Sequence, residues 1–162
     1  MELIIPKSSG TWCDGIGSGG DETLRCEAGP EKGRKRKTER WQTIALGAAK
    51  QSKRMQIPTV HMPVTFQQAL AMMAESDVRL MPYENAEGME GTRKILESIE
   101  PGESIAILIG PEGGIDEAEV EMAMKAKVEP ITLGKRILRT ETAGMTVLSI
   151  LVYLLEGRER TR

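Results

Sequence analysis

One segment constrains the fold more than any other part of the chain. It is the apolar run 104–109 (SIAILI), followed at once by the glycine-bearing segment 109–114 (IGPEGG). A continuous apolar run of this length is typical of a buried parallel strand. The patterns on either side of it alternate between strand-like and helix-like periods. The sequence therefore predicts an α/β domain with a mainly parallel sheet flanked by helices.

The same patterns place the other elements. Strands are expected at 2–7, 78–83 and 129–133, and helices at 38–54, 65–74, 90–99, 116–127 and from Thr140 to a stop at Gly157. The helix at 116–127 has the clearest signals, with Asp116 as N-cap and Glu119 at the position of a capping box. Ile115 and Val120 occupy the two positions of a hydrophobic staple. The last helix has an apolar side formed by Val147, Leu148, Leu151, Val152 and Leu155.

The residues before position 34 have a different character. After the opening strand, the segment 8–33 is rich in Gly, Ser, Asp and Glu and has no period, so we expect a loop or disorder. We accordingly divide the chain into 1–33, a strand plus an irregular segment, and 34–162, the folded domain. The basic cluster Arg34–Lys37 opens this domain. It is compatible with a solvated loop before the first helix or with contact to RNA phosphates.

Composition limits the class of protein. The 162 residues suit one domain, and a net charge of −2 excludes a uniformly basic surface but not a local basic patch. Cys13 and Cys26 stand near neither another cysteine nor His61, so we expect no metal site and free thiols. Neither a signal peptide nor a bilayer-length apolar run is visible, which predicts a cytoplasmic protein without a membrane partner.

Two loops carry the candidate chemistry. In the first, Gly110, Gly113 and Gly114 follow the most buried strand, and glycines there let backbone approach a ligand closely. Because the loop holds no basic residue, adenine or an amino acid suits it better than phosphate. An ordinary strand-to-helix connector is the alternative interpretation.

The second loop is 133–143. It also follows a strand and opens a helix, and Thr140 or Thr142 can cap that helix. Arg136 and Arg139 flank the apolar pair Ile137-Leu138, which could clasp a flat ligand. The alternative is that both arginines are ordinary loop-surface residues.

Together the two loops resemble a known signature. Segments 108–114 and 133–143 are similar to the paired motif of the RsmE-type methyltransferases, which act on uridine N3 in 16S ribosomal RNA. Upstream, Arg40-Trp41-Gln42 and the segment 48–58 resemble the family's helix and its Gln–Arg–Pro segment. The resemblance covers about residues 37–155.

This resemblance implies a SPOUT methyltransferase fold, whose C-terminal part is tied in a deep trefoil knot. It implies a homodimer, no metal, and S-adenosyl-L-methionine (SAM) held between three loops. The family's N-terminal PUA-like barrel has no counterpart in these residues. The implied cofactor-binding residues are Leu80, Met81, Pro82, Ile109, Gly110, Pro111, Glu112, Gly113, Gly114, Leu133, Gly134, Ile137, Leu138 and Thr142.

The implied reaction assigns further roles. Uridine N3 is a poor nucleophile until its proton leaves, so the site needs a base or a cation that stabilises the uridine anion. We expect Arg139 to be that cation. Glu112 is a candidate proton acceptor, or alternatively a hydrogen-bonding partner of the backbone. Contacts to ribosomal RNA or the small ribosomal subunit are expected from Gln51, Lys53, Arg54 and Arg136.

Two rival functions share these features. A SPOUT ribose 2′-O-methyltransferase would have the same knot and cofactor site. An inactive RNA-binding paralogue, or a truncated fragment, would keep the fold without catalysis. Intact loops at 110–114 and 133–143 count against the second rival.

Overall fold

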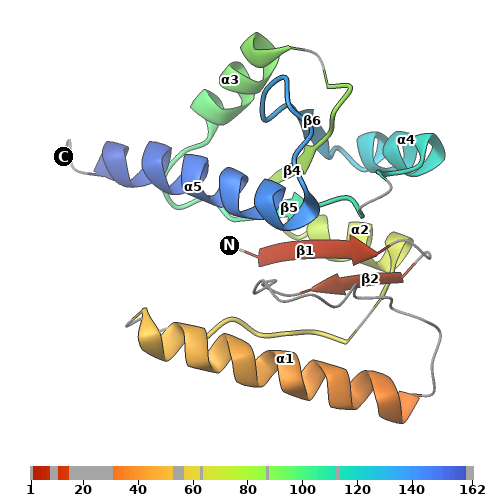
Figure 1. Ribbon diagram of the computed structural model, residues 1–162. Coiled ribbons are helices and arrows are strands. Elements are labelled where there is room, and N and C mark those ends of the chain that lie inside the picture. Colours follow the sequence, from red (N-terminus) through yellow and green to blue (C-terminus); the bar gives the residue numbers. More distant parts are fainter. Residues whose placement is uncertain are drawn as a thin grey trace.

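The computed structural model describes residues 2–7, 11–14, 31–52, 57–62, 64–86, 88–111 and 114–159 (Figure 1). Its strands are β1 (Glu2–Lys7), β2 (Thr11–Asp14), β3 (Val64–Thr65), β4 (Val78–Pro82), β5 (Ile105–Leu108) and β6 (Glu129–Ile131). Its helices are α1 (Glu31–Gln51), α2 (Phe66–Met73), α3 (Met89–Ser98), α4 (Glu117–Lys125) and α5 (Thr140–Glu159). None of the described helices is long and apolar enough to cross a membrane.

The six strands form one sheet in the order β3-β2-β1-β5-β4-β6. The four strands β1, β5, β4 and β6 are parallel, with Leu3 opposite Ile107 and Leu80 opposite both Ile107 and Glu129. β2 and β3 extend the β1 side of the sheet as antiparallel strands. The predicted α/β class with a mainly parallel sheet is therefore confirmed.

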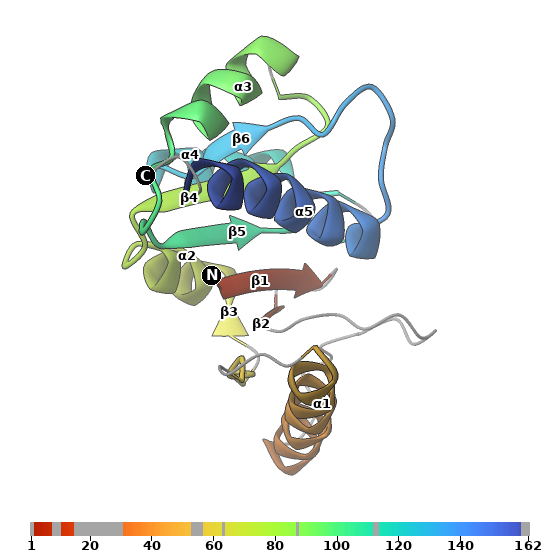
Figure 2. The same ribbon diagram turned by 90° about the vertical axis from the view of Figure 1, so that its left-hand side faces the viewer.

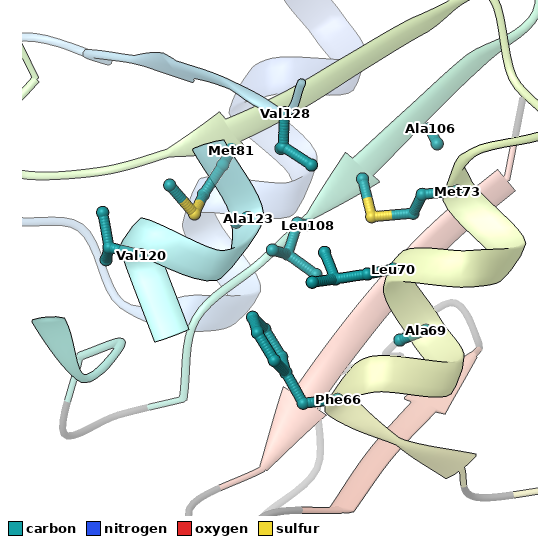
Figure 3. Packing of buried hydrophobic residues seen from close by; sticks show 10 residues of the cluster. All are labelled: Phe66, Ala69, Leu70, Met73, Met81, Ala106, Leu108, Val120, Ala123 and Val128. Atoms are coloured by element: carbon teal, nitrogen blue, oxygen red, sulfur yellow. The ribbon is translucent and has the colours of Figure 1, made fainter. Parts of the chain in front are cut away.

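β5 lies in the middle of the parallel strands and is covered on both faces. Ala106 and Leu108 face a core cluster made with α2 and α4, whose buried side chains are drawn in Figure 3. Ile105 and Ile107 face a second cluster, made with α3 and α5. Figure 2 shows α5 lying across this second face of β4 and β5. Burial of each Ile or Leu side chain in this run contributes about 1.5–3 kcal/mol, which explains why the run is apolar throughout.

Two helices begin as their sequences indicate. Thr65 caps α2 in a full capping box with Gln68, and Phe66, Ala69, Leu70 and Met73 form its buried face. Asp116 caps α4, but its carboxylate accepts from the N–H of Ala118 at 2.9 Å, so the expected capping box with Glu119 is replaced by a single cap bond. Ile115 and Val120 pack in the same cluster, as the staple predicts.

Three expected boundaries were wrong. Thr11–Asp14 forms β2 inside the segment expected to be irregular, because it satisfies the backbone groups on the open side of β1. α1 begins at Glu31, so the basic cluster lies within the helix rather than before it; Lys, Arg and Glu are good helix formers. α5 continues through Gly157 to Glu159, since one glycine costs a helix only about 1 kcal/mol.

Candidate functional site: a pocket at the ends of the parallel strands

Three segments that follow β4, β5 and β6 meet at the carboxyl edge of the sheet and enclose a cavity of about 710 Å³. Ligands of open α/β sheets bind outside this edge, and the volume suits a molecule of cofactor size. The lining residues are Pro82, Tyr83, Glu84, Ile109, Gly110, Pro111, Gly114, Ile115, Thr132, Leu133, Gly134, Lys135, Arg136, Ile137, Leu138, Arg139, Thr140 and Ala143.

Hydrogen bonds within and between the three walls define their backbone. The N–H of Tyr83 donates to the carbonyl of Ile131 at 2.9 Å, which joins the β4 segment to the end of β6. The N–H of Gly114 donates to the carbonyl of Pro111 at 3.0 Å and closes a turn in the β5 segment. The N–H of Gly134 donates to the hydroxyl of Thr132 at 3.3 Å. Each wall therefore contains a backbone group whose position is defined by a hydrogen bond.

Glycine is required at several points of this lining. Gly114 (φ +80°) and Gly134 (φ +114°) adopt backbone angles that L side chains rarely adopt, and a Cβ at either would meet no atom within 4 Å. A side chain at either residue would extend into open space beside the cavity. At Gly110 a Cβ would lie 2.8 Å from Cγ1 of Ile115, so a side chain there would force Ile115 to shift.

Most of the predicted cofactor residues lie together in this pocket. The lining includes Pro82, Ile109, Gly110, Pro111, Gly114, Leu133, Gly134, Ile137 and Leu138, together with Arg136 and Arg139.

The other predicted residues lie elsewhere. Leu80 and Met81 are fully buried and belong to the two core clusters. Thr142 is exposed on the first turn of α5 and is not among the lining residues. Gln51 is exposed at the end of α1, and α1 lies apart from the pocket-forming strands in both views (Figures 1 and 2).

Four predicted residues, Lys53, Arg54, Glu112 and Gly113, lie outside the described residues.

Sequence reasoning missed several lining residues. Tyr83 and Glu84 follow β4 directly, and the rule that ligands bind at strand ends could have found them. Thr132 follows β6 in the same way. Lys135 lies inside the second predicted loop, where the motif alone indicates no particular role for it.

Charge is distributed unevenly around the mouth of the pocket. Lys135, Arg136 and Arg139 are exposed cations on the β6 segment, and Glu84 is an exposed carboxylate on the β4 segment. Ile137 stands between the cations with 84% of its surface exposed. Among the described residues, no group of three or more His, Cys, Asp or Glu could hold a metal ion. The described site thus offers cations, apolar surface and backbone groups to a ligand.

An open, mainly parallel sheet whose strand-end segments enclose a pocket is the arrangement of a ligand-binding α/β domain. A family model described as "RNA methyltransferase domain" matches residues 22–152. Because that match extends over most of the chain, the chain belongs to the RNA methyltransferase domain family.

Similar proteins and structures have names that fit this family. The chain is 40% identical to "Ribosomal RNA small subunit methyltransferase E" of Bacillus subtilis, over 78% of this chain and 50% of the relative. It is 31% identical to the protein of that name from Synechocystis, over 97% of this chain and 54% of the relative. A crystal structure of the Neisseria gonorrhoeae protein of the same name, bound to S-adenosyl methionine, matches with a TM-score of 0.64 and 34% identity, over 75% of this chain and 49% of that one. The chain thus spans about half the length of these relatives.

Proposed function

We propose that the chain is the catalytic part of a SAM-dependent RNA methyltransferase that modifies N3 of a uridine in 16S ribosomal RNA. One observation carries the proposal: three strand-end segments enclose a single pocket in a chain of the RNA methyltransferase domain family. Support for the cofactor comes from the similar Neisseria protein, whose crystal structure is bound to S-adenosyl methionine.

The lining residues fit this cofactor chemically. Gly114 and Gly134 leave space that a Cβ would fill, so backbone can approach a ligand closely. Leu133 and Leu138, which are half-buried, offer apolar surface to a flat adenine ring. Backbone amide and carbonyl groups of the three segments are available for the polar atoms, a combination that small-molecule sites commonly use.

When bound, SAM supplies a methyl group attached to a positively charged sulfur, which is already a good leaving group. The chain's own residues therefore act mainly by positioning. Arg139 at the pocket mouth would orient the uridine and stabilise the anion that forms when N3 loses its proton, because a guanidinium stays charged at any working pH. Glu112 is the proposed proton acceptor and lies outside the described residues.

The RNA would extend beyond the pocket. Arg136 at the mouth would contact the nucleotides near the uridine. We assign more distant phosphate contacts to Gln51, Lys53 and Arg54, and to the basic cluster on α1, in which Lys35, Arg36 and Lys37 are exposed. Remote contacts of this kind supply binding energy that positions the reacting base.

Three further features belong to this proposal. Residues 34–162 would form the catalytic domain, with β1 and β2 completing its sheet. Its C-terminal part would be tied in a trefoil knot, as the resemblance to the SPOUT family implies. A homodimer would form through α5, whose Met145, Val152 and Tyr153 are exposed apolar residues. Action on ribosomal RNA would require a cytoplasmic location.

Two measurements on the purified chain test the proposal. Calorimetry with SAM in the presence of EDTA should give saturable heat; absence of binding would overturn the enzyme assignment. Incubation with unmodified small ribosomal subunits, followed by nucleoside analysis, should give N3-methyluridine. A ribose 2′-O-methyl product would overturn the assignment to the base while keeping that to the cofactor.

A further inference from the structure

Two buried polar residues connect α3 to the pocket. Thr92 (4% exposed) and Thr132 (9% exposed) are the buried polar residues of the described chain. The hydroxyl of Thr92 accepts a hydrogen bond from the backbone N–H of Thr132 at 2.8 Å. Thr132 lines the pocket, whereas neither Thr92 nor any other residue of α3 is among the lining residues. α3 therefore contacts the pocket wall through a side-chain hydroxyl.

The bond lies at a peptide unit that is held at both ends. The carbonyl of Ile131 and the N–H of Thr132 belong to the same peptide. That carbonyl accepts from the N–H of Tyr83 at 2.9 Å, and that N–H donates to Thr92. Because Tyr83 and Thr132 both line the pocket, this peptide sets the position of one wall relative to another.

Thr132 in turn is hydrogen-bonded to Gly134, two residues further along the chain. The hydroxyl of Thr132 accepts from the N–H of Gly134 at 3.3 Å and lies 3.4 Å from its carbonyl oxygen, to which it donates. Gly134 has a φ of +114°, and this angle directs the segment that carries Arg136 and Arg139. If Thr132 moved, its own part of the pocket wall would move, and so would the segment that carries Arg136 and Arg139 at the mouth of the pocket.

We propose that Thr92 is a positioning residue for cofactor binding, and that its hydroxyl holds the Ile131–Thr132 peptide and thereby the Thr132–Gly134 turn. This inference rests on the proposed function, since it takes SAM as the ligand of the pocket. A threonine that merely filled space could be replaced by valine, which has nearly the same shape. Valine offers no acceptor, so the buried N–H of Thr132 would lose its partner and the turn would move.

The test compares Thr92→Val with Thr92→Ser in the full chain. Thr92→Val should weaken SAM binding about tenfold in calorimetry. Thr92→Ser keeps the hydroxyl and should bind within about threefold of the parent. Single-turnover methyl transfer at saturating SAM should change little in either variant, because Thr92 does not touch the reacting atoms. Hydrogen exchange at the Thr132 amide should accelerate in Thr92→Val alone.

Thr43→Val is the matched control, because the hydroxyl of Thr43 donates to the carbonyl of Glu39 at 2.9 Å on α1, away from the pocket. It should leave SAM affinity unchanged. If the parent binds SAM and Thr92→Val binds equally well, the positioning role is overturned and the proposed function stands. If the parent binds no SAM, the proposed function itself fails. If Thr92→Val does not fold, the comparison is made between Thr92→Ala, which lacks the hydroxyl, and Thr92→Ser, which keeps it. Equal SAM affinity of these two variants would overturn the inference.

Discussion

Two glycines in this chain have similar backbone angles in very different places. Gly134 (φ +114°) lines the pocket, and Gly102 (φ +101°) lies in the turn between α3 and β5; at each a Cβ would meet nothing within 4 Å. Valine at either position should cost about 1–3 kcal/mol of stability through backbone strain. Both variants would therefore carry similar backbone strain, but only Gly134 lines the pocket.

We expect Gly134→Val to weaken SAM binding at least about tenfold in calorimetry, because a side chain there would both move the turn and occupy space beside the ligand. Gly102→Val should lose a similar amount of thermal stability while keeping the parent's affinity. Equal affinity in the two variants would mean that SAM binds elsewhere.

Arg139 differs from the other pocket cations in its proposed role. Arg139→Ala should fold normally and lower the single-turnover rate about 10²–10³-fold at saturating SAM, the usual loss when one electrostatic donor to a developing anion is removed. Arg93→Ala, which removes an exposed arginine of α3, is the control and should leave the single-turnover rate unchanged. A defect confined to SAM affinity or thermal stability would assign Arg139 a structural role.

Asp77 and Ser104 join the amino ends of β4 and β5, opposite the pocket. The hydroxyl of Ser104 donates to the Asp77 carboxylate at 2.6 Å and its N–H donates at 2.9 Å, and these bonds lower the pKa of Asp77. A carboxyl with a lowered pKa stabilises the fold above its unfolded pKa and loses that contribution as the pH falls through the folded value.

Ser104→Ala should therefore reduce stability at neutral pH and flatten its decline below the ordinary pKa of an aspartate. Denaturant unfolding at a series of acid pH values measures this. Parallel stability curves for parent and variant would contradict the assignment.

At the scale of elements, α1 carries the remote RNA contacts of the proposed function. Replacing Lys35, Arg36 and Lys37 by Gln should weaken RNA binding. It should also reduce the slope of log affinity against log salt by about 0.7 to 0.9 for each phosphate that the protein no longer neutralises. A triple replacement of Arg93, Lys94 and Lys125 on α3 and α4 changes the charge equally and should have little effect. SAM affinity should not change in either protein.

Sequence patterns predicted the elements that have strong local signals. The run at β5 and the Asp116 cap of α4 have strong local signals, so pattern and fold agree. β2 escaped prediction because its four residues stand among glycines and are stabilised by pairing with β1, a partner outside the local pattern. The early start of α1 was missed because a basic run was interpreted as a loop.

The site also contains residues that sequence motifs reveal and residues that they do not. The glycine segments after β5 and β6 were visible as motifs, and the structure brings them together. In the β4 segment, Leu80 and Met81 belong to opposite core clusters, and the pocket lining begins at Pro82. The bond between Thr92 and Thr132 joins residues 40 positions apart, and no periodicity reveals such a contact.

At the scale of the whole molecule, the proposed dimer depends on α5. Tyr153 is 81% exposed and Met145 59% exposed on a helix whose other side is core. The chain should be a dimer in light scattering at micromolar concentration, and Tyr153→Glu should make it monomeric by placing a charge in an apolar interface. Ile44→Glu, on an exposed position of α1, should leave the dimer intact. A monomeric parent would contradict the proposed assembly.

The order of the strands along the chain has a consequence for synthesis. The third wall of the pocket comes from residues 132–143, and β6, which supports it, pairs with β4 at the far side of the sheet. A nascent chain that ends before Thr132 can already pair β1, β5 and β4, yet it lacks the segment that closes the pocket. Under the proposed function, cofactor capture is therefore a late event, because SAM could stabilise the domain only after residues 132–143 have left the ribosome.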